Sequence, residues 1–261
     1  MDEEGNNSKR HVFAVVNQKG GVGKSTTAVN LAAALGELGQ KVLLIDLDPQ
    51  GNATSGFGLS KNRRGKCVYN ALLEETTLEE IAEITDSPGV TVVPSTIQLA
   101  GAEVELVNAM SREMRLRRLI EPIRDQYDYV LIDCAPSLGL LTINALTAAD
   151  GLIIPIQCEF YALEGLSKLL DSVRLVNTHL NAELRVFGVV MTMYSSRMRL
   201  ANQVVAEVRA YFDDEVFKTL IPRTVRLSEA PGFGLPITEY DTTGKGALAY
   251  RNLAKEVVSR G

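Results

Sequence analysis

The sequence predicts an α/β protein with a doubly wound, mostly parallel sheet and helices on both of its faces. Three observations lead to this fold class. Short apolar runs recur along all 261 residues, amphipathic helical patterns separate them, and a glycine-rich segment joins the first run to the first helix. Strands that are buried on both faces give nearly continuous apolar runs, and a repeated β–α order implies right-handed crossovers between parallel strands.

The predicted strands are short runs rich in β-branched and other apolar residues. In chain order they are His11–Asn17, Lys41–Asp46, Val90–Pro94, Tyr129–Asp133, Gly151–Gln157, Val186–Met193 and Val216–Ile221.

Helical patterns with one apolar face fill the segments between the strands. Apolar residues that recur every three or four positions indicate a helix that buries one side. This spacing occurs in Ala28, Leu31, Ala32 and Leu35, in Leu163, Leu166, Leu170 and Val173, and in Tyr250, Leu253, Ala254, Val257 and Val258. The last stripe is small and contains no Phe or Trp, so we expect it to pack on the sheet.

Composition limits the possible classes of protein. With 46% hydrophobic and 23% charged residues, the chain has the profile of a globular protein. Its start is polar and acidic, unlike a secretory signal, and runs such as Gly151–Ile156 are far shorter than the ~20 residues that span a bilayer. The three cysteines contain no C-x-x-C pair, which argues against a disulfide framework. We expect a cytoplasmic protein with a disordered tail over residues 1–10 and one domain over residues 11–261.

Charge is distributed unevenly along the chain. The formal net charge is −5, so DNA binding would require a local basic cluster. Segment Ala71–Glu105 carries acids and no Lys or Arg, which we interpret as solvated helix faces. Segments Ser111–Arg124, for which we expect a helix, and Arg197–Arg226 are instead rich in arginine and are candidates for binding a partner.

The most specific motif is Lys19-Gly-Gly-Val-Gly-Lys-Ser-Thr26, which directly follows a predicted strand and precedes a predicted helix. Glycines allow successive backbone N–H groups to converge on phosphate oxygens, and the helix N-terminus adds positive charge. In such a loop Lys24 reaches the β- and γ-phosphates and the Ser25 hydroxyl binds Mg²⁺. The usual pattern has a glycine where this chain has Gln18, and Lys19 is an additional lysine.

Three further acidic residues lie at or just after the ends of two predicted strands. Asp133 ends one strand, so its carboxylate projects from the carboxyl edge of the sheet toward the same loop, where it can hold a water of the Mg²⁺ shell. Asp46 and Asp48 follow another strand in the same way, and a carboxylate there can position an attacking water. Each position alone also fits an ordinary turn.

Together these motifs resemble the deviant Walker A ATPases of the ParA/MinD group. The resemblance rests on Lys19–Thr26, Asp46–Asn52 and Ile132–Ser137, and it extends from about residue 11 to the C-terminus. Four further segments are similar to the chromosomal ParA proteins called Soj: Gln98–Glu103, Leu141–Leu146, Gln157–Gly165 and Pro222–Pro231.

The resemblance implies a single P-loop ATPase domain over residues 11–261 that binds ATP and Mg²⁺. It assigns catalysis to Lys19, Lys24 and Asp48, with Lys19 acting across a homodimer on the partner's nucleotide and Asp48 orienting the hydrolytic water. The implied ATP-binding residues are Lys19, Gly20, Gly21, Val22, Gly23, Lys24, Ser25, Thr26, Pro222, Arg223 and Thr224. The implied metal-site residues are Ser25, Asp48 and Asp133. The family usually has Asn at the position of Thr224 and Pro at the position of Ala135.

The resemblance also implies partners. It predicts an ATP-dependent DNA-partitioning switch whose dimer binds double-stranded DNA without sequence preference and is released by a ParB-type centromere-binding protein. This places the protein in the cytoplasm, on the nucleoid, and without a membrane partner. Arg197, which we expect to open a helix, and Arg226 match the arginines that the family uses for DNA. Both could instead pair with Glu207 or with Asp213–Glu215.

Two related classes are alternatives. A membrane-associated cell-division regulator resembling MinD would need a C-terminal amphipathic helix with bulky apolar residues. An iron–sulfur reductase of the nitrogenase iron protein type would need four cysteine ligands at a shared cluster. Cys134 lies near such a position, but a small buried hydrophobe at the end of a strand explains it better.

Overall fold

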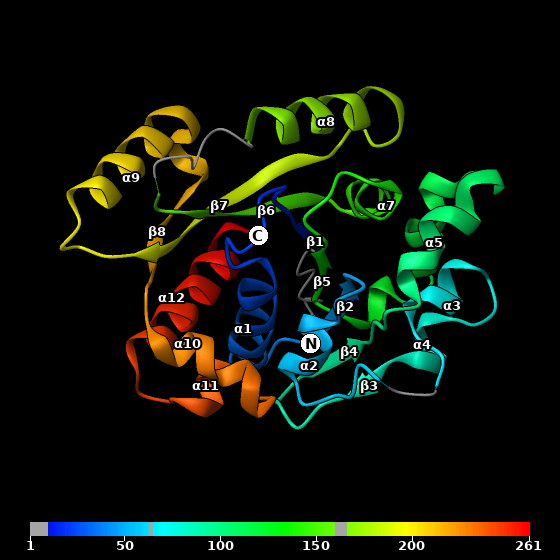
Figure 1. Ribbon diagram of the computed structural model, residues 1–261, viewed down its shortest axis with the longest axis horizontal. Coiled ribbons are helices and arrows are strands. Elements are labelled where there is room, and N and C mark those ends of the chain that lie inside the picture. The colour runs from blue at the N-terminus through cyan, green and yellow to red at the C-terminus, as the bar shows by residue number, and fades with distance from the viewer. Residues whose placement is uncertain (1–9, 63–64, 160–165) are drawn as a thin grey trace, which may run out of the picture.

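The computed structural model describes residues 10–62, 65–159 and 166–261 (Figure 1). Within them the strands form an eight-stranded sheet in the order β3-β4-β2-β5-β1-β6-β7-β8. Neighbouring strands are parallel, except that β3 is antiparallel to β4. The strands are β1 His11–Val15, β2 Val42–Leu47, β3 Glu83–Ile84, β4 Val90–Val93, β5 Tyr129–Cys134, β6 Gly151–Gln157, β7 Arg185–Tyr194 and β8 Val216–Pro222.

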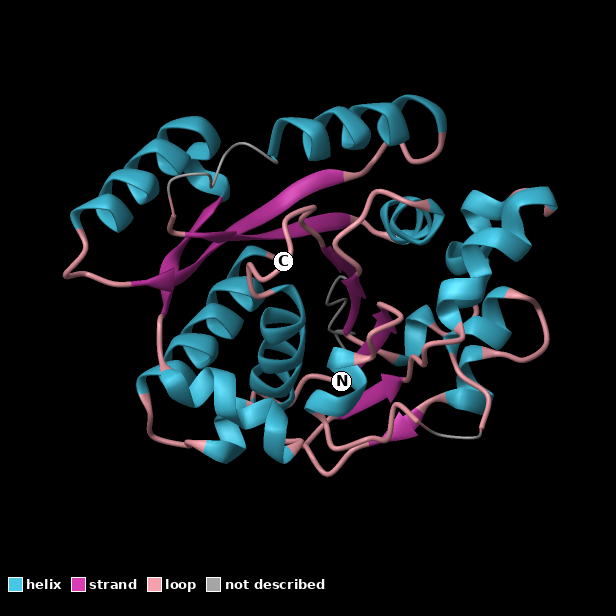
Figure 2. Ribbon diagram, in the orientation of Figure 1, coloured by secondary structure: helices cyan, strands magenta, loops and turns pink. Residues whose placement is uncertain are grey.

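Helices cover both faces of this sheet (Figure 2). The α-helices are α1 Lys24–Glu37, α2 Asn52–Gly56, α3 Val68–Leu72, α4 Leu78–Ile81, α5 Leu99–Glu105, α6 Arg115–Ile120, α7 Leu140–Ala148, α8 Leu166–His179, α9 Arg199–Phe212, α10 Val225–Glu229, α11 Ile237–Tyr240 and α12 Lys245–Arg260. The 3₁₀ turns are η1 Leu106–Asn108, η2 Arg112–Met114, η3 Arg124–Gln126, η4 Asp213–Glu215 and η5 Ala230–Phe233.

The sheet separates two apolar cores. Along β1, Val12 and Ala14 belong to the core shared with α7, α8 and α9, whereas Phe13 and Val15 belong to the core shared with α1 and α12. This alternation follows from the period of two in a β-strand. Because both faces are covered, both sets are apolar, which is why the strands appear as continuous apolar runs in the sequence. The predicted doubly wound, mostly parallel fold is therefore confirmed.

The predicted boundaries are wrong in several places. Strand β1 ends at Val15 and not at Asn17, and β3 was missed because an antiparallel pair of two residues has no periodic signal. In α12 the side chain of Val258 is 39% exposed, whereas the other apolar residues of its stripe are buried. Leu163 and residues 1–9 lie outside the described residues, so the disordered tail remains a prediction.

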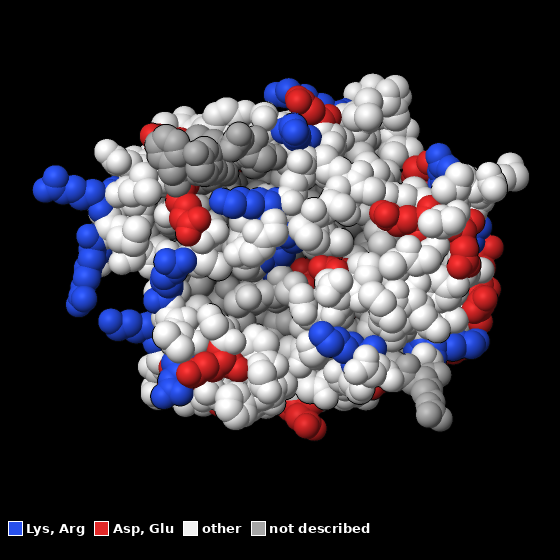
Figure 3. Space-filling model, viewed as in Figure 1, with Lys and Arg blue, Asp and Glu red and all other residues white. Residues whose placement is uncertain are grey.

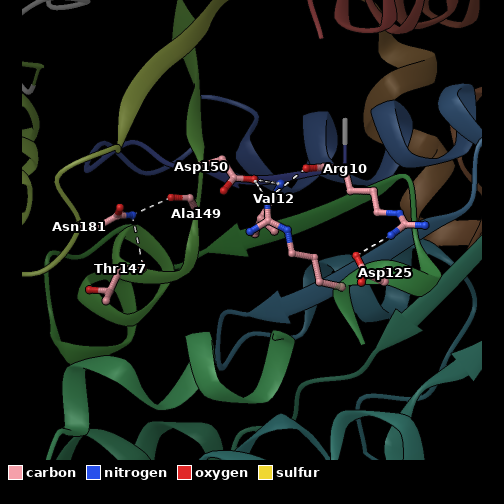
Figure 4. A network of polar contacts seen from close by, with 8 residues as sticks. Arg10, Val12, Asp125, Thr147, Ala149, Asp150 and Asn181 are labelled. Atoms are coloured by element: carbon pink, nitrogen blue, oxygen red, sulfur yellow. Dashed lines mark hydrogen bonds and ion pairs between the residues drawn. The ribbon is translucent and has the colours of Figure 1, made fainter. Parts of the chain in front are cut away.

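A polar network fixes the end of the sheet at which β1 and β6 begin (Figure 4). The Asp150 carboxylate accepts hydrogen bonds from the Val12 backbone N–H at 2.8 Å and from the Arg124 guanidinium at 2.6 Å. The Asn181 side-chain amide donates to the Ala149 carbonyl at 2.7 Å, which ties the turn after α8 to the start of β6. These bonds lie at the amino ends of the strands, opposite the edge where the predicted site residues gather.

Strand β8 forms one edge of the sheet, and a carboxylate covers part of it. The backbone N–H groups of Lys218 and Thr219 each donate to Glu256 of α12 over 2.8 Å. The other edge is the two-residue strand β3. No helix in the described part of the chain is long and apolar enough to cross a bilayer.

We predict that Gly36→Ala destabilises the protein by about 1–3 kcal/mol, because overpacking forces the surrounding structure to shift. A Cβ at Gly36 in α1 would lie 1.9 Å from the Pro88 carbonyl oxygen, which is backbone and cannot rotate away. Urea denaturation measures this change. Gly101→Ala in α5 is the matched control, because its Cβ would meet only the flexible Glu105 side chain, at 3.3 Å, and the Tyr69 ring at an ordinary 3.8 Å. Equal stabilities of the two variants would contradict the prediction.

Candidate functional site

The glycine-rich loop between β1 and α1 leaves open space above its backbone. Gly21 and Gly23 have φ values of +74° and +91°, a left-handed conformation that favours glycine. A Cβ added at Gly20 or Gly21 would meet nothing within 4 Å. The loop therefore exposes its backbone to a cavity and leads directly into the N-terminus of α1.

Two side chains that the sequence analysis missed hold this loop on the sheet. The Asn17 amide donates to the Pro155 carbonyl at 2.8 Å, and its oxygen accepts the Lys19 backbone N–H at 3.0 Å. The Thr192 hydroxyl of β7 donates to the Val22 carbonyl at 2.8 Å. Asn17 could have been identified from its position directly before the motif. Thr192 lies 170 residues from Val22, so only the fold reveals its role.

Lys24, the second lysine of the motif, is buried at the base of the loop. Its ammonium donates to the Lys19 carbonyl at 3.1 Å. Burial lowers the pKa of Lys24, while the nearby Asp133 carboxylate raises it, and Cys134 and Asp48 do so to a smaller degree. The loss of hydration is the larger effect because a charged amine in a dry site lacks its water shell. An anion bound next to this amine would replace the lost hydration, because its negative charge stabilises the charged form of Lys24.

Asp46 and Asp133 occupy neighbouring strands in the same register, on β2 and β5. Asp46 is fully buried and accepts hydrogen bonds from the Thr54 backbone N–H at 2.7 Å and from the Thr54 hydroxyl at 2.6 Å. Burial raises the pKa of Asp46 to about 6 despite these bonds. Asp46 therefore holds α2 in place, and its carboxylate is already used.

Asp133 is different, because neither of its buried carboxylate oxygens has a hydrogen-bond partner of ordinary geometry among the described residues. Burial, followed by the charge of Asp46, raises the pKa of Asp133 well above its usual range, and the Ser25 hydroxyl lowers it in part. Buried carboxylates without partners are costly. A hydrated cation held between Ser25 and Asp133 would remove that cost, so this donor set fits Mg²⁺, which prefers oxygen ligands and retains waters.

Asp48 lies in the loop after β2 and lines the same cavity. It is buried, and one of its carboxylate oxygens accepts the Gln50 backbone N–H at 2.9 Å. The cavity of about 380 Å³ that Asp48 lines has room for a water. The structure therefore brings Lys24, Ser25, Asp48 and Asp133 together at one edge of the sheet, as the sequence predicted.

Two adjoining cavities extend from this point. One of about 380 Å³ is lined by the glycine-rich loop, Asp48 and Pro136. The other, of about 420 Å³, is lined by Pro222, Arg223 and Thr224, three of the implied ATP-binding residues. The residues common to both linings are Gly23, Thr26, Met193 and Pro231. A ligand as long as a nucleotide would therefore extend from one cavity into the other.

Thr224 has a further role in this wall. Its hydroxyl accepts the Leu227 backbone N–H at 3.2 Å and so caps the N-terminus of α10. The position at which the family usually has Asn thus carries another good capping residue, and the capping bond leaves the O–H of Thr224 able to donate.

The two predicted DNA-binding arginines, Arg197 and Arg226, are both exposed. Arg197 lies in the turn before α9, which begins at Arg199, so the prediction that Arg197 opens the helix is wrong. Arg226 lies on α10 and pairs with Glu229 at 3.1 Å, not with Glu207 or with the acids of η4. Lys and Arg side chains gather along the edge formed by α9, β8, α10 and α12 (Figure 3).

The other basic segment is neither a single helix nor a free basic surface. Residues 112–126 form η2, α6 and η3 in place of the predicted helix. Three of its arginines form ion pairs: Arg112 with Glu113, Arg115 with Glu74 and Arg124 with Asp150. These pairs reduce the positive charge available to a ligand there.

Comparison with known sequences agrees with this geometry. A family model described as an AAA domain matches residues 10–186. The sporulation initiation inhibitor protein Soj of Bacillus subtilis (strain 168) is 56% identical over 96% of this chain and 99% of its own length. The chromosome partitioning protein ParA of Myxococcus xanthus (strain DK1622) is 51% identical over 95% of this chain and 88% of its own length. The chain belongs to the Soj/ParA family.

Two of the solved structures similar to this family member carry ADP and magnesium. Cobyrinic acid a,c-diamide synthase from Mycobacterium smegmatis, with bound ADP and magnesium, has a TM-score of 0.83 at 37% identity and covers 94% of this chain and 93% of its own. MinD from Pyrococcus horikoshii, complexed with Mg-ADP, has a TM-score of 0.78 at 25% identity and covers 95% of this chain and 96% of its own. The P-loop fold of the Soj/ParA family is thus confirmed for this chain.

We predict that Lys24→Ala weakens nucleotide binding at least tenfold, because it removes a positive charge placed directly at the phosphates. Equilibrium titration with a fluorescent ATP analogue measures this loss. Lys41→Ala removes an exposed lysine next to β2 and serves as the control, with unchanged binding expected. Wild-type affinity in Lys24→Ala would show that the phosphates bind elsewhere.

Proposed function

We propose that this protein is an ATP-dependent switch for DNA partitioning. In this proposal ATP and Mg²⁺ bind at the glycine-rich loop, and two subunits close over two nucleotides. The closed dimer binds double-stranded DNA without sequence preference. Hydrolysis, stimulated by a ParB-type partner, returns it to a state that leaves the DNA. The protein would then act in the cytoplasm, on the nucleoid of a chromosome or on a plasmid.

The ATPase part rests on the Asp133 carboxylate, which has no hydrogen-bond partner of ordinary geometry among the described residues, and on buried Lys24 near it. In this arrangement Lys24 and the loop N–H groups would hold the β- and γ-phosphates, while Ser25 and Asp133 would hold Mg²⁺ through direct and water-mediated contacts. Bound Mg²⁺ supplies positive charge that offsets the phosphate oxygens. Asp48 would orient the water that attacks the γ-phosphorus, so that ADP and inorganic phosphate are the products.

Lys19 supports the dimeric part of the proposal. Its backbone is fixed by Asn17, and its ammonium has no ion pair among the residues that the structure describes. A second lysine on a phosphate loop is able to serve another subunit's nucleotide, as an arginine finger does in other phosphoryl-transfer enzymes. A closed dimer also doubles a basic edge by two-fold symmetry, which would give a chain of net charge −5 a larger local basic surface for DNA.

The partitioning role is supported by the names of the relatives, since those at 51% and 49% identity are chromosome partitioning proteins. A MinD-like membrane role is less well supported, because α12 buries Tyr250, Leu253 and Val257 against the sheet. A diamide synthase activity is also less well supported, because that enzyme is only 37% identical to this chain, below the 49–51% of the partitioning proteins.

We predict that Asp48→Ala binds ATP with near wild-type affinity but hydrolyses it at least tenfold more slowly, because the water loses its orienting carboxylate. ATP should then trap a stable dimer. Size measurement with ATP, with ADP and without nucleotide tests this for wild type and variant. If the variant keeps its fold but loses ATP binding, the role assigned to Asp48 is wrong.

We predict that Lys19→Ala binds ATP as a monomer but does not form the ATP dimer, because its charge acts on the other subunit's nucleotide. Light scattering of the double variant Lys19→Ala, Asp48→Ala with ATP measures this, and Asp48→Ala alone is the control. A loss of monomer binding as severe as that of Lys24→Ala would show that Lys19 acts within its own subunit.

We predict that Arg226→Ala weakens binding to all DNA sequences alike and makes the slope of log affinity against log salt shallower by about 0.9 for each phosphate that the variant no longer neutralises. ATP binding and dimerisation should remain. Anisotropy titrations at several salt concentrations, in the Asp48→Ala background, measure both quantities. Arg174→Ala is the matched control, because Arg174 on α8 is also exposed and forms a similar pair three residues apart, with Asp171. Identical slopes for both variants would place the DNA surface elsewhere.

A further inference from the structure

A groove on the opposite side from the basic edge is not used by the proposed nucleotide or DNA sites. This α5–α8 groove has a volume of about 550 Å³ and lies between α5 with η1, the start of α7, and the second half of α8. Its lining includes Val107, Leu138, Ile143 and Leu175. Val107 and Leu175 are 52% and 62% exposed, so the groove presents apolar side chains to solvent.

The apolar surface continues beyond the groove along the same segment. Val104 on α5 is 75% exposed, and Met110 after η1 is 88% exposed. Isolated apolar residues on a surface are ordinary, but several on one segment beside an apolar groove indicate an interaction site.

The charge around the α5–α8 groove is negative. Glu103 lines it, and one of its carboxylate oxygens is buried without a hydrogen-bond partner among the described residues. The other charged residues of the lining, Arg112 and Glu113, neutralise each other at 2.9 Å. Acidic side chains gather over α3 and α5 in Figure 3, and residues 71–105 contain no Lys or Arg. An occupant of this groove therefore meets apolar walls and an unpaired negative charge.

The groove reaches the nucleotide site through a short loop. Leu138 and Gly139 line the groove, and Pro136, two residues before Leu138, lines the nucleotide cavity. This loop follows β5, which carries Asp133, and leads into α7. Glu103 packs against it closely, since a Cβ at Gly139 would lie 1.9 Å from a Glu103 carboxylate oxygen. Any group that displaces or pairs with Glu103 must therefore act on the loop beside the Mg²⁺ and phosphate positions.

We propose that the α5–α8 groove is the docking site for a basic, amphipathic segment of the partner protein that stimulates ATP hydrolysis, with a Lys or Arg side chain paired to Glu103 and apolar side chains packed on Val107 and Leu175. The inference rests on the proposed function for the existence of that partner. Charge complementarity selects this occupant over a second copy of the chain, whose groove is equally acidic. The location also suits the proposed switch. The α5–α8 groove lies on the side opposite the basic edge, so a partner can dock there while DNA is bound to the basic edge.

The test uses the full-length ParB-type protein as the probe and the variant Val107→Lys, Leu175→Lys. These side chains do not belong to the nucleotide or DNA machinery, so basal ATPase and DNA binding should stay at wild-type levels and report an intact fold. Binding of the ParB-type protein, measured by calorimetry with ATP, should weaken at least tenfold, and stimulation of ATPase should disappear. Glu103→Gln should weaken binding about fivefold and reduce its dependence on salt.

Ile84→Lys is the matched control. Ile84 is 87% exposed and belongs to the same acidic segment, residues 71–105, but it does not line the groove. This variant should bind the ParB-type protein with wild-type affinity, and its ATPase should be stimulated as in the wild type. Stimulation of the double variant equal to that of the wild type would overturn the inference while leaving the proposed function intact. Loss of ATP-dependent dimerisation in the double variant would make the groove a subunit interface and would also overturn it. A wild type that neither binds nor responds to the ParB-type protein would instead refute the partner in the proposed function.

Discussion

The site depends on a charge that the protein leaves unbalanced. Strands β2 and β5 place two buried carboxylates side by side, and Thr54 satisfies only that of Asp46. Within the described residues Asp133 keeps its oxygens without partners, next to a lysine whose own charge is disfavoured by burial. Such an arrangement is costly in an empty protein and becomes favourable only when cation and anion arrive together. Binding of a metal ion and of a triphosphate would thus be coupled by electrostatics alone.

The rigid parts of the fold make this coupling precise. Asn17 and Thr192 fix the glycine-rich loop to β6 and β7, and the Asp150 network fixes the opposite end of the sheet. The site therefore lies at the carboxyl edge of a sheet whose loop motif and whose opposite end are both fixed by side-chain hydrogen bonds.

The sequence predicted most of the fold because buried parallel strands leave a strong local signal. It also predicted that Lys24, Ser25, Asp48 and Asp133 lie at one edge of the sheet, since each stands at or after a strand end or in the loop motif, while their roles stay predictions. It did not predict Thr54 and Thr192, because their partners lie on other elements and short polar residues carry no distinctive pattern. The break of residues 112–126 into three short elements was missed for a similar reason: the Asn144 side chain bonds to Arg112 and Leu116 across the core, which overrides local helix propensity.

The two edges of the sheet affect how copies of this protein behave when crowded. An open strand edge is a template for strand addition and, at high local concentration, for fibrous aggregates. Here Glu256 occupies backbone donors of β8, and at the other end β3 offers only two residues in the antiparallel sense. Molecules gathered densely on a polymer would therefore meet without extending one another's sheets. Contacts between such neighbouring molecules would then remain reversible, and the number of molecules in a row would be set by the length of the polymer that binds them.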